Sequence, residues 1–280
     1  MAVVIAAPVA TMAAENRGPQ TDNSINVSTN EVRQALAYTP GVLDASGQSS
    51  TSGDADSAIV AATAGATIDV PKDASEGVTI ADANGTALDI QLPNADQAGN
   101  AKQVAPGVVA YDGTNGSANA VQTDENGGVR MLTIIDNPNA PTSYDYKVTV
   151  PTGGRIELTP QGGAVVLTND GRIITMVNTP WAKDAKGKQI RTWFTTDGAT
   201  LTQHVQHNVR GVVYPVTADP WWNPLSWFSG FTWVRGVKVL AKKIGPWGWV
   251  ICAAGGGWAW YRSDSSGWVR VGDAVSGCLL

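Results

Sequence analysis

The chain has few of the residues from which catalytic and metal sites are usually built. Its 280 residues contain two histidines and two cysteines, too few for a disulfide-dense scaffold. It lacks a Gly-x-Ser-x-Gly elbow, a phosphate-binding loop and a His-Glu-x-x-His signature. Its carboxylates are scattered, so no pair is marked out for glycoside hydrolysis. The sequence therefore predicts no catalytic residue, metal ion or cofactor; an enzyme is an alternative that a cleft of converging carboxylates would reveal.

Charge is also scarce. Charged residues make up 15% of the chain, against roughly 25% in ordinary soluble domains. Glycine is abundant, with 31 residues, and no long heptad pattern is present, which argues against a helical protein. The net charge of −5 supplies no basic footprint for nucleic acid, so no nucleic-acid partner is predicted.

The two histidines, His204 and His207, lie in a run with the character of a strand. A spacing of three places them on opposite faces of a strand. A zinc site would also need two further ligands close by. We expect both to be hydrogen-bonded structural side chains rather than a ligand pair.

The N-terminus resembles a targeting segment. Residues 1–14 are predicted to be a signal-peptide-like remnant, because they are apolar and uncharged after Met1, with Thr11 and Ala13 at the −3 and −1 positions of a cleavage site. The alternative is a buried N-terminal strand or helix. Export is the favoured interpretation, which predicts a secreted protein, free or associated with the cell envelope.

Residues 15–65 are predicted to be a flexible, disordered tether. The run Ser46–Asp54 is rich in serine and glycine and has no apolar periodicity, so burial cannot offset its ordering entropy. The run Glu31–Tyr38 offers two helical turns, too few for a helix that stands alone.

Residues 66–220 are predicted to form an antiparallel β module. Short alternating runs recur at a spacing of roughly ten residues, and each is bounded by turn formers. The runs are 78–81, 87–92, 130–135, 144–150, 155–159, 164–168, 172–177, 189–194 and 200–207. Glycine-containing links at 152–154, 161–163, 169–171 and 197–198 favour tight hairpins, so neighbouring strands are expected to pair as a meander. The pattern leaves open whether they form a sandwich or one elongated sheet.

The last sixty residues differ from the rest. Residues 221–280 hold nine of the eleven tryptophans and both cysteines, and carry six Lys and Arg against two Asp, a net charge of +4. Residues 1–220 carry a net charge of −9. We therefore expect residues 221–280 to form a second module that is basic, tryptophan-rich and partly helical.

An amphipathic helix is predicted from Ser229 or Gly230 to Gly245, ahead of Pro246. One face carries Trp233, Val237, Leu240 and Ile244, and the other carries Arg235, Lys238 and Lys242. This pattern is typical of a helix lying on an anionic membrane. A helix packed on the β module with its lysines in water is the alternative.

The following run, Ile244–Tyr261, has no charged residue and has tryptophans near both ends, as spanning segments do. Its Ala253–Gly257 stretch is weakly hydrophobic and breaks helices, which argues against a stable span. A disulfide between Cys252 and Cys278 is expected in an exported protein, where it would close a loop of about 27 residues and contribute about 3–4 kcal/mol; two buried thiols are the alternative. The predicted membrane-binding residues are Trp233, Arg235, Val237, Lys238, Leu240, Lys242, Lys243, Ile244, Trp247, Trp249, Trp258 and Trp260.

Five runs stand out between Tyr144 and Trp222: Val150–Gly154, Gly163–Val166, Thr179–Gly187, Leu201–His207 and Tyr214–Trp221. In these runs the stretch resembles a module of secreted, mostly uncharacterised actinobacterial proteins. The most specific is Tyr-Pro-Val-x-Ala-Asp-Pro, which closes the β module in the proteins it resembles and precedes a variable tail. The resemblance implies export and a two-part architecture, and it implies no catalytic residues.

Two functions are compatible with these patterns. In the first, the C-terminal module is a bacteriocin-like, antimicrobial segment that acts on or binds anionic membranes, carried and masked in the precursor by the acidic β module. Asp219 and Pro220 mark the candidate processing site that would release it. In the second, the whole protein is a non-enzymatic binding or structural component of the cell envelope, with tryptophans contacting glycan or protein. The first is favoured because indoles paired with cations suit a lipid–water interface.

Overall fold

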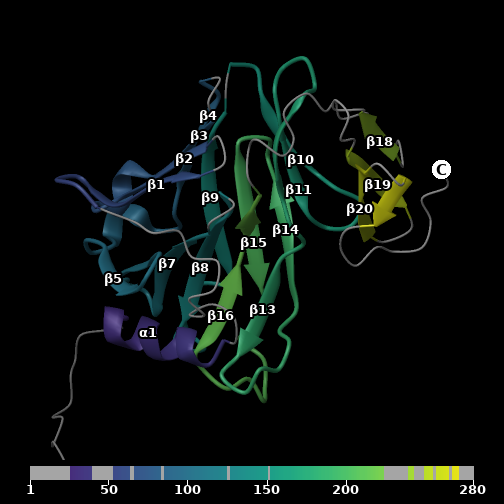
Figure 1. The fold of residues 1–280 in the computed structure, drawn as a ribbon. Helices are drawn as coiled ribbons and strands as arrows, with labels where there is room; N and C mark the ends of the chain where they lie inside the picture. The colour runs from purple at the N-terminus through teal and green to yellow at the C-terminus, as the bar shows by residue number, and fades with distance from the viewer. Residues whose placement is uncertain are drawn as a thin grey trace, which may run out of the picture.

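The structure is a computed structural model that describes residues 26–39, 53–63, 66–82, 85–124, 127–150 and 152–223, and the backbone of four strands between 239 and 270. The fold is mainly β. Residues 26–223 form two antiparallel sheets, with one α-helix packed on the second (Figure 1). We call this part the body.

The first sheet has seven strands and one exposed face. In β9, even-numbered residues such as Tyr144 and Tyr146 are buried and odd-numbered ones are exposed, the alternation of a sheet with one face in water. In spatial order its strands are β1 (Ser57–Thr63), β2 (Ala66–Pro71), β3 (Val78–Asp82), β4 (Ala87–Gln91), β9 (Ser143–Thr149), β15 (Thr200–Val205) and β14 (Thr192–Thr196).

The second sheet is covered on both faces over its central strands. All seven residues of β7 are buried, and β8 is buried except at Arg130. In spatial order its strands are β10 (Arg155–Leu158), β11 (Ala164–Leu167), β12 (Ile173–Val177), β17 (Trp221–Trp222), β8 (Val129–Ile135), β7 (Ser117–Thr123), β6 (Val108–Tyr111) and β5 (Lys102–Ala105). Two further strands lie off this path: β16 (Val216–Asp219) pairs with β8, and β13 (Trp181–Asp184) pairs with β16.

The two sheets share one hydrophobic core, so the body is a sandwich. Apolar side chains from the inner faces of both sheets, such as Ile68 and Leu88 from the first and Val121 and Met131 from the second, belong to one buried cluster. The hydroxyls of Thr133 in β8 and Tyr146 in β9 are 3.0 Å apart, which adds a polar link between the layers. The sandwich alternative of the sequence analysis is therefore the one observed.

Helix α1 (Thr29–Ala37) covers the other face of the second sheet. Its residues Val32, Ala35 and Leu36 are buried in a second cluster with apolar side chains of β6, β7 and β8. This spacing of three and four residues forms one apolar stripe along the helix. The helix lies within the range predicted to be a tether, as does strand β1. The tether prediction is wrong for these two segments, because packing on the sheet supplies the stability that a two-turn helix lacks by itself.

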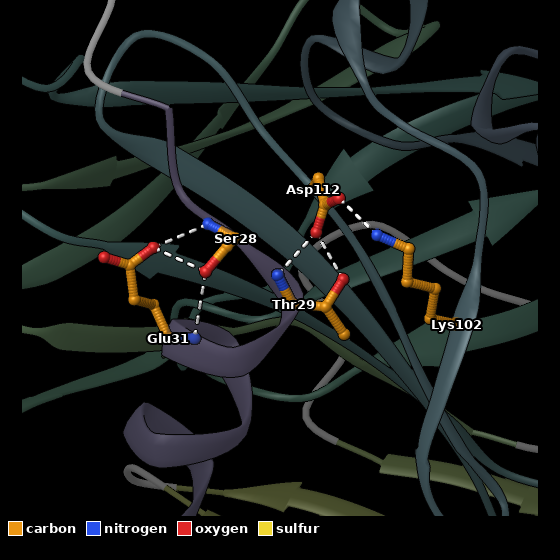
Figure 2. A network of polar contacts seen from close by, with 5 residues as sticks. All are labelled: Ser28, Thr29, Glu31, Lys102 and Asp112. Atoms are coloured by element: carbon orange, nitrogen blue, oxygen red, sulfur yellow. Dashed lines mark hydrogen bonds and ion pairs between the residues drawn. The ribbon is translucent and has the colours of Figure 1, made fainter.

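The start of α1 is fixed by side chains, as Figure 2 shows. Ser28 and Glu31 form a capping box, in which each side chain bonds the other residue's backbone N–H. Asp112, which directly follows β6, accepts hydrogen bonds from both the backbone N–H and the hydroxyl of Thr29, and it pairs with Lys102. The helix is therefore attached to the body at its first turn as well as along its apolar stripe.

Three predicted hairpins are confirmed. The pairs β10–β11, β11–β12 and β14–β15 are antiparallel, and their connections contain Gly162, Gly171 and Gly198 at positive φ. The expectation that neighbouring strands pair throughout is wrong between β9 and β10, because these consecutive strands belong to different sheets. A meander therefore describes parts of the chain and not the whole body.

Two short 3-10 helices, η1 (Ala74–Glu76) and η2 (Ala95–Gln97), lie in connections of the body. Beyond Asn223 the structure describes four strands that form an antiparallel sheet of their own: β18 (Val239–Lys242), β19 (Trp249–Ala254), β20 (Gly257–Asp264) and β21 (Gly267–Arg270). Val239–Lys242 is thus a strand where the sequence predicted part of an amphipathic helix; its valine and its pairing with β19 suit a strand. The remainder of that predicted helix lies outside the described residues.

Candidate functional site

The closing strand, which we define as residues 214–223, joins the parts of the second sheet. Its first half, β16, pairs with β8 on one side and with β13 on the other. Its second half, β17, pairs with β8 and with β12. Pro220 lies between the halves, where its missing N–H breaks the ladder, while its carbonyl accepts a hydrogen bond of 3.1 Å from the N–H of Met131. This strand contains the Tyr-Pro-Val-x-Ala-Asp-Pro phrase.

Tyr214 fixes the entry to the closing strand. Its hydroxyl donates to the carbonyl of His207 and lies 3.0 Å from Nδ1 of the same residue, while Nε2 of His207 lies 2.9 Å from the carbonyl oxygen of Pro141. Burial lowers the pKa of His207, and its hydrogen bonds to backbone carbonyls oppose that effect only in part. The bond from Tyr214 to Pro215 is cis. Both ring nitrogens of His207 thus lie within hydrogen-bond distance of partners in the body.

A buried ion pair stands at the centre of the closing strand. Asp219 is 2% exposed, and its Oδ2 lies 3.3 Å from Nε of Arg130, within ion-pair distance but without the alignment of a hydrogen bond. Burial raises the pKa of the Asp219 carboxyl to about 7, although Arg130 and hydrogen bonds from Trp181 act to lower it. The guanidinium carbon of Arg130 is 4.7 Å from the ring centre of Trp221, a cation–π contact.

The closing strand ends in the interior. Trp222 is fully buried, the largest such side chain in the body. The next residue, Asn223, is bound at both backbone and side chain: its Nδ2 donates to the carbonyl of Met176 at 2.7 Å, and its own carbonyl accepts from the hydroxyl of Thr175 at 2.6 Å. Residues 221–223 thus pack with the body, so the predicted boundary after Pro220 falls within the closing strand.

The predicted processing residues are inaccessible in the folded body. Asp219 and Pro220 are both buried and lie in a strand with neighbours on each side. Proteases bind exposed and extensible segments, so cutting this bond would require the sheet to open. Release of a tail from the folded body would have to occur beyond Asn223.

The predicted membrane-binding residues fall outside the body. Leu240 and Lys242 lie in β18, Trp249 in β19, and Trp258 and Trp260 in β20. The others, Trp233, Arg235, Val237, Lys238, Lys243, Ile244 and Trp247, lie outside the described residues. Of the predicted disulfide, Cys252 is in β19, and Cys278 lies outside the described residues.

A second feature lies on the exposed face of the first sheet. Trp193 in β14 pairs across the sheet with His204 in β15, and their rings stack at 5.1 Å between centres. The guanidinium carbon of Arg191 is 4.9 Å from the ring centre of Trp193. Nε2 of His204 is 2.8 Å from the hydroxyl of Thr195. His204 and His207 are therefore held in separate environments.

Two of the residues that hold the closing strand, Arg130 and Trp181, were missed by sequence reasoning. Arg130 was visible as the one charged residue in the apolar run Val129–Ile135, a position where a charge needs a partner. In the described residues, no group of three or more potential metal ligands occurs, and none of the helices there is long and apolar enough to cross a membrane. Compared with family models, curated proteins and solved structures, the chain matches none.

Proposed function

We propose that this protein is an exported, non-enzymatic carrier whose folded body presents the basic, tryptophan-rich segment 224–280 to anionic membranes. The observation that carries the proposal is the position of Asn223. The hydrogen bonds of Asn223 and the burial of Trp222 complete the sandwich at that point. Residues up to Asn223 are therefore held in the core of the body, which supports treating the segment after it as a separate unit.

The composition of residues 224–280 supports a membrane target. The segment contains seven tryptophans, and six Lys and Arg against two Asp. Indoles favour the headgroup region of a bilayer, and each cation near an anionic surface contributes about 1 kcal/mol. The resemblance of the closing phrase to secreted actinobacterial proteins with variable tails supports export and a two-part architecture.

The charge of the body supports masking of this segment before it acts. Residues 54–96 contain eight Asp and Glu and one Lys, so one part of the body is strongly acidic. Attraction between this part and the basic segment would be weakened by salt, because exposed charges are screened over about 10 Å at 0.1 M. Masking would thus be reversible.

The test is dye release from vesicles by the full chain and by a chain ending at Asn223. We expect the full chain to release dye from phosphatidylglycerol vesicles and not from phosphatidylcholine vesicles, and the shortened chain to release none. The full-length variant with Lys242→Gln and Lys243→Gln is expected to release less than wild type. Equal release by the full and shortened chains, or no release by the full chain in either lipid, would refute a membrane-active segment.

A glycan-binding envelope protein is the second candidate, and the exposure of Trp193, at 39%, favours it. Sugar rings stack on such indoles. However, His204 and Arg191 already contact this ring, so a sugar would have to displace one of them. Saturable binding to purified cell-wall glycan that is lost in Trp193→Ala would support this candidate over the first.

A further inference from the structure

A group of cations lies at one end of the body, where the turn after β13 meets the loop after β15 (lower end of β13 in Figure 1). We define the basic patch as these cations and the two apolar side chains beside them. All six are exposed: Lys186, Lys188, Arg191, Trp193, Val209 and Arg210.

The patch is held together by backbone contacts. The carboxylate of Asp184 accepts hydrogen bonds from the N–H groups of Lys186 and Lys188 at 2.9 and 3.0 Å, and from that of Val213 at 3.2 Å. The carbonyl of Arg191 accepts from the N–H of Gln206 at 2.9 Å. The turn and the loop that carry these cations are therefore fixed beside each other.

The patch has little opposing charge. Two carboxylates occur between residues 183 and 213, against five Lys and Arg. Asp184 is buried; burial acts to raise its pKa, but the backbone N–H groups outweigh this and lower it. Asp197 lies at the far tip of the β14–β15 hairpin, where it accepts hydrogen bonds from Ala199 and Thr200. Asp184 is thus the carboxylate of this segment that lies beside the exposed cations, next to Lys188, and with five cations against two carboxylates the segment keeps a net charge of +3.

The basic patch also contains two exposed apolar side chains. Val209 and Trp193 are 44% and 39% exposed, and they are two of the four large apolar side chains exposed among the described residues. Cations around an exposed aliphatic and an indole side chain are typical of proteins that dock on bilayers, where the charges meet anionic headgroups and the apolar groups enter the interface.

We propose that the basic patch docks the body on an anionic lipid bilayer. Because the patch is positively charged, its partner should be negatively charged. The exposed Val209 and Trp193 favour a lipid bilayer over a soluble polyanion, because a polyanion offers no apolar layer that these side chains could enter. The contact is separate from segment 224–280, so body and segment would engage one membrane at two places. Two weak attachments on one surface reinforce each other, because the second forms at high effective concentration.

The experiment measures co-sedimentation of the full chain with vesicles of phosphatidylglycerol and phosphatidylcholine. Replacing Lys186 and Lys188 by Gln is expected to lower partitioning onto anionic vesicles by at least about tenfold. The matched control replaces Lys147 and Arg172 by Gln, which removes the same charge elsewhere on the body and is expected to change partitioning less than twofold. Val209→Ser is expected to lower the binding that survives in 0.5 M salt, where exposed charges are screened.

The outcomes distinguish the patch proposal from the proposal that segment 224–280 is membrane-active, on which the patch proposal does not depend. If Lys242→Gln with Lys243→Gln abolishes dye release while binding through the patch persists, both proposals stand. If the full chain releases no dye but still binds anionic vesicles in a patch-dependent manner, the patch proposal alone stands. Equal partitioning of the patch variant and its control would overturn the patch proposal. The patch proposal would also be overturned if the variant with Lys186→Gln and Lys188→Gln binds vesicles like wild type but loses affinity for a soluble sulfated polysaccharide.

Discussion

Nε of Arg130 and Oδ2 of Asp219 are 3.3 Å apart, and one belongs to β8 while the other belongs to the closing strand. The side chain of Arg130 is 22% exposed and that of Asp219 is 2% exposed. The charge of Asp219 is therefore stabilised mainly by Arg130, whereas the charge of Arg130 is also stabilised by water.

Removing the arginine is expected to destabilise the body strongly. Arg130→Met leaves the Asp219 carboxyl buried without its cation, at a cost of about 3–5 kcal/mol where that carboxyl is ionised, well above pH 7, and at a smaller cost below pH 7, where it is protonated. The double variant with Asp219→Asn is expected to be more stable than Arg130→Met alone, because no buried charge is left. Urea unfolding of wild type, both single variants and the double variant measures this. Additive effects would show that the two side chains do not interact.

The pH dependence of stability follows from the raised pKa of Asp219. Its folded pKa is about 7 against an ordinary value of 3.8, so the stability that it contributes is fully present below pH 3.8 and is lost as the pH rises through 7. Relative to Asp219→Asn, wild type should thus be more stable at pH 5 than at pH 8.5 by about 2–3 kcal/mol. Comparison with the variant is needed because the pKa of His207 is lowered, so that its contribution to the stability of the body is lost as the pH falls. A difference that does not vary with pH would contradict the shift.

Helix α1 is expected to be part of the cooperative body. Leu36→Ala removes a fully buried side chain and should cost about 2–5 kcal/mol. Gln34→Ala, at an exposed position on the same helix, is the control and should change stability by less than about 0.5 kcal/mol. Chemical denaturation provides the measurement. If both variants unfold like wild type, residues 29–37 act as a tether after all.

Limited proteolysis tests whether the closing strand is part of the folded body. Under native conditions a protease of broad specificity is expected to produce no fragment that begins between Thr217 and Trp222, because the chain is buried or paired there. Such fragments should appear once urea unfolds the body. N-terminal sequencing and mass spectrometry identify the products. A native fragment starting at Pro220 would place the processing site where the sequence suggested it.

Local features of the fold were predictable from the sequence, and non-local ones were not. The hairpin turns at Gly162, Gly171 and Gly198 are confirmed because tight turns need positive φ close to paired strands. The separation of β9 and β10 into two sheets was missed, since no pattern in the chain records which sheet a strand joins. Helix α1 was expected only as two turns within Glu31–Tyr38, because its stability comes from packing on strands far along the chain.

The candidate site was predictable in part. Asp219 and Pro220 were identified from the sequence as a candidate processing site. The ion pair that Asp219 forms could not be identified in this way, because its partner Arg130 lies 89 positions earlier. The basic patch was missed because its cations are spread over 25 residues, from Lys186 to Arg210, and the contacts of Asp184 bring them together. Acidic residues elsewhere in the chain also hid this local excess of positive charge from the net charge.

The place of the closing strand in the chain has a kinetic consequence. Because β16 and β17 lie about 80–90 residues after the strand β8 that they join, their pairing requires closure of a large loop, and such contacts form slowly. They are also the last part of the body to be synthesised. The second sheet can therefore be completed only when the ribosome has made the chain through Trp222, so that β8 waits for this neighbour while almost 90 further residues are added.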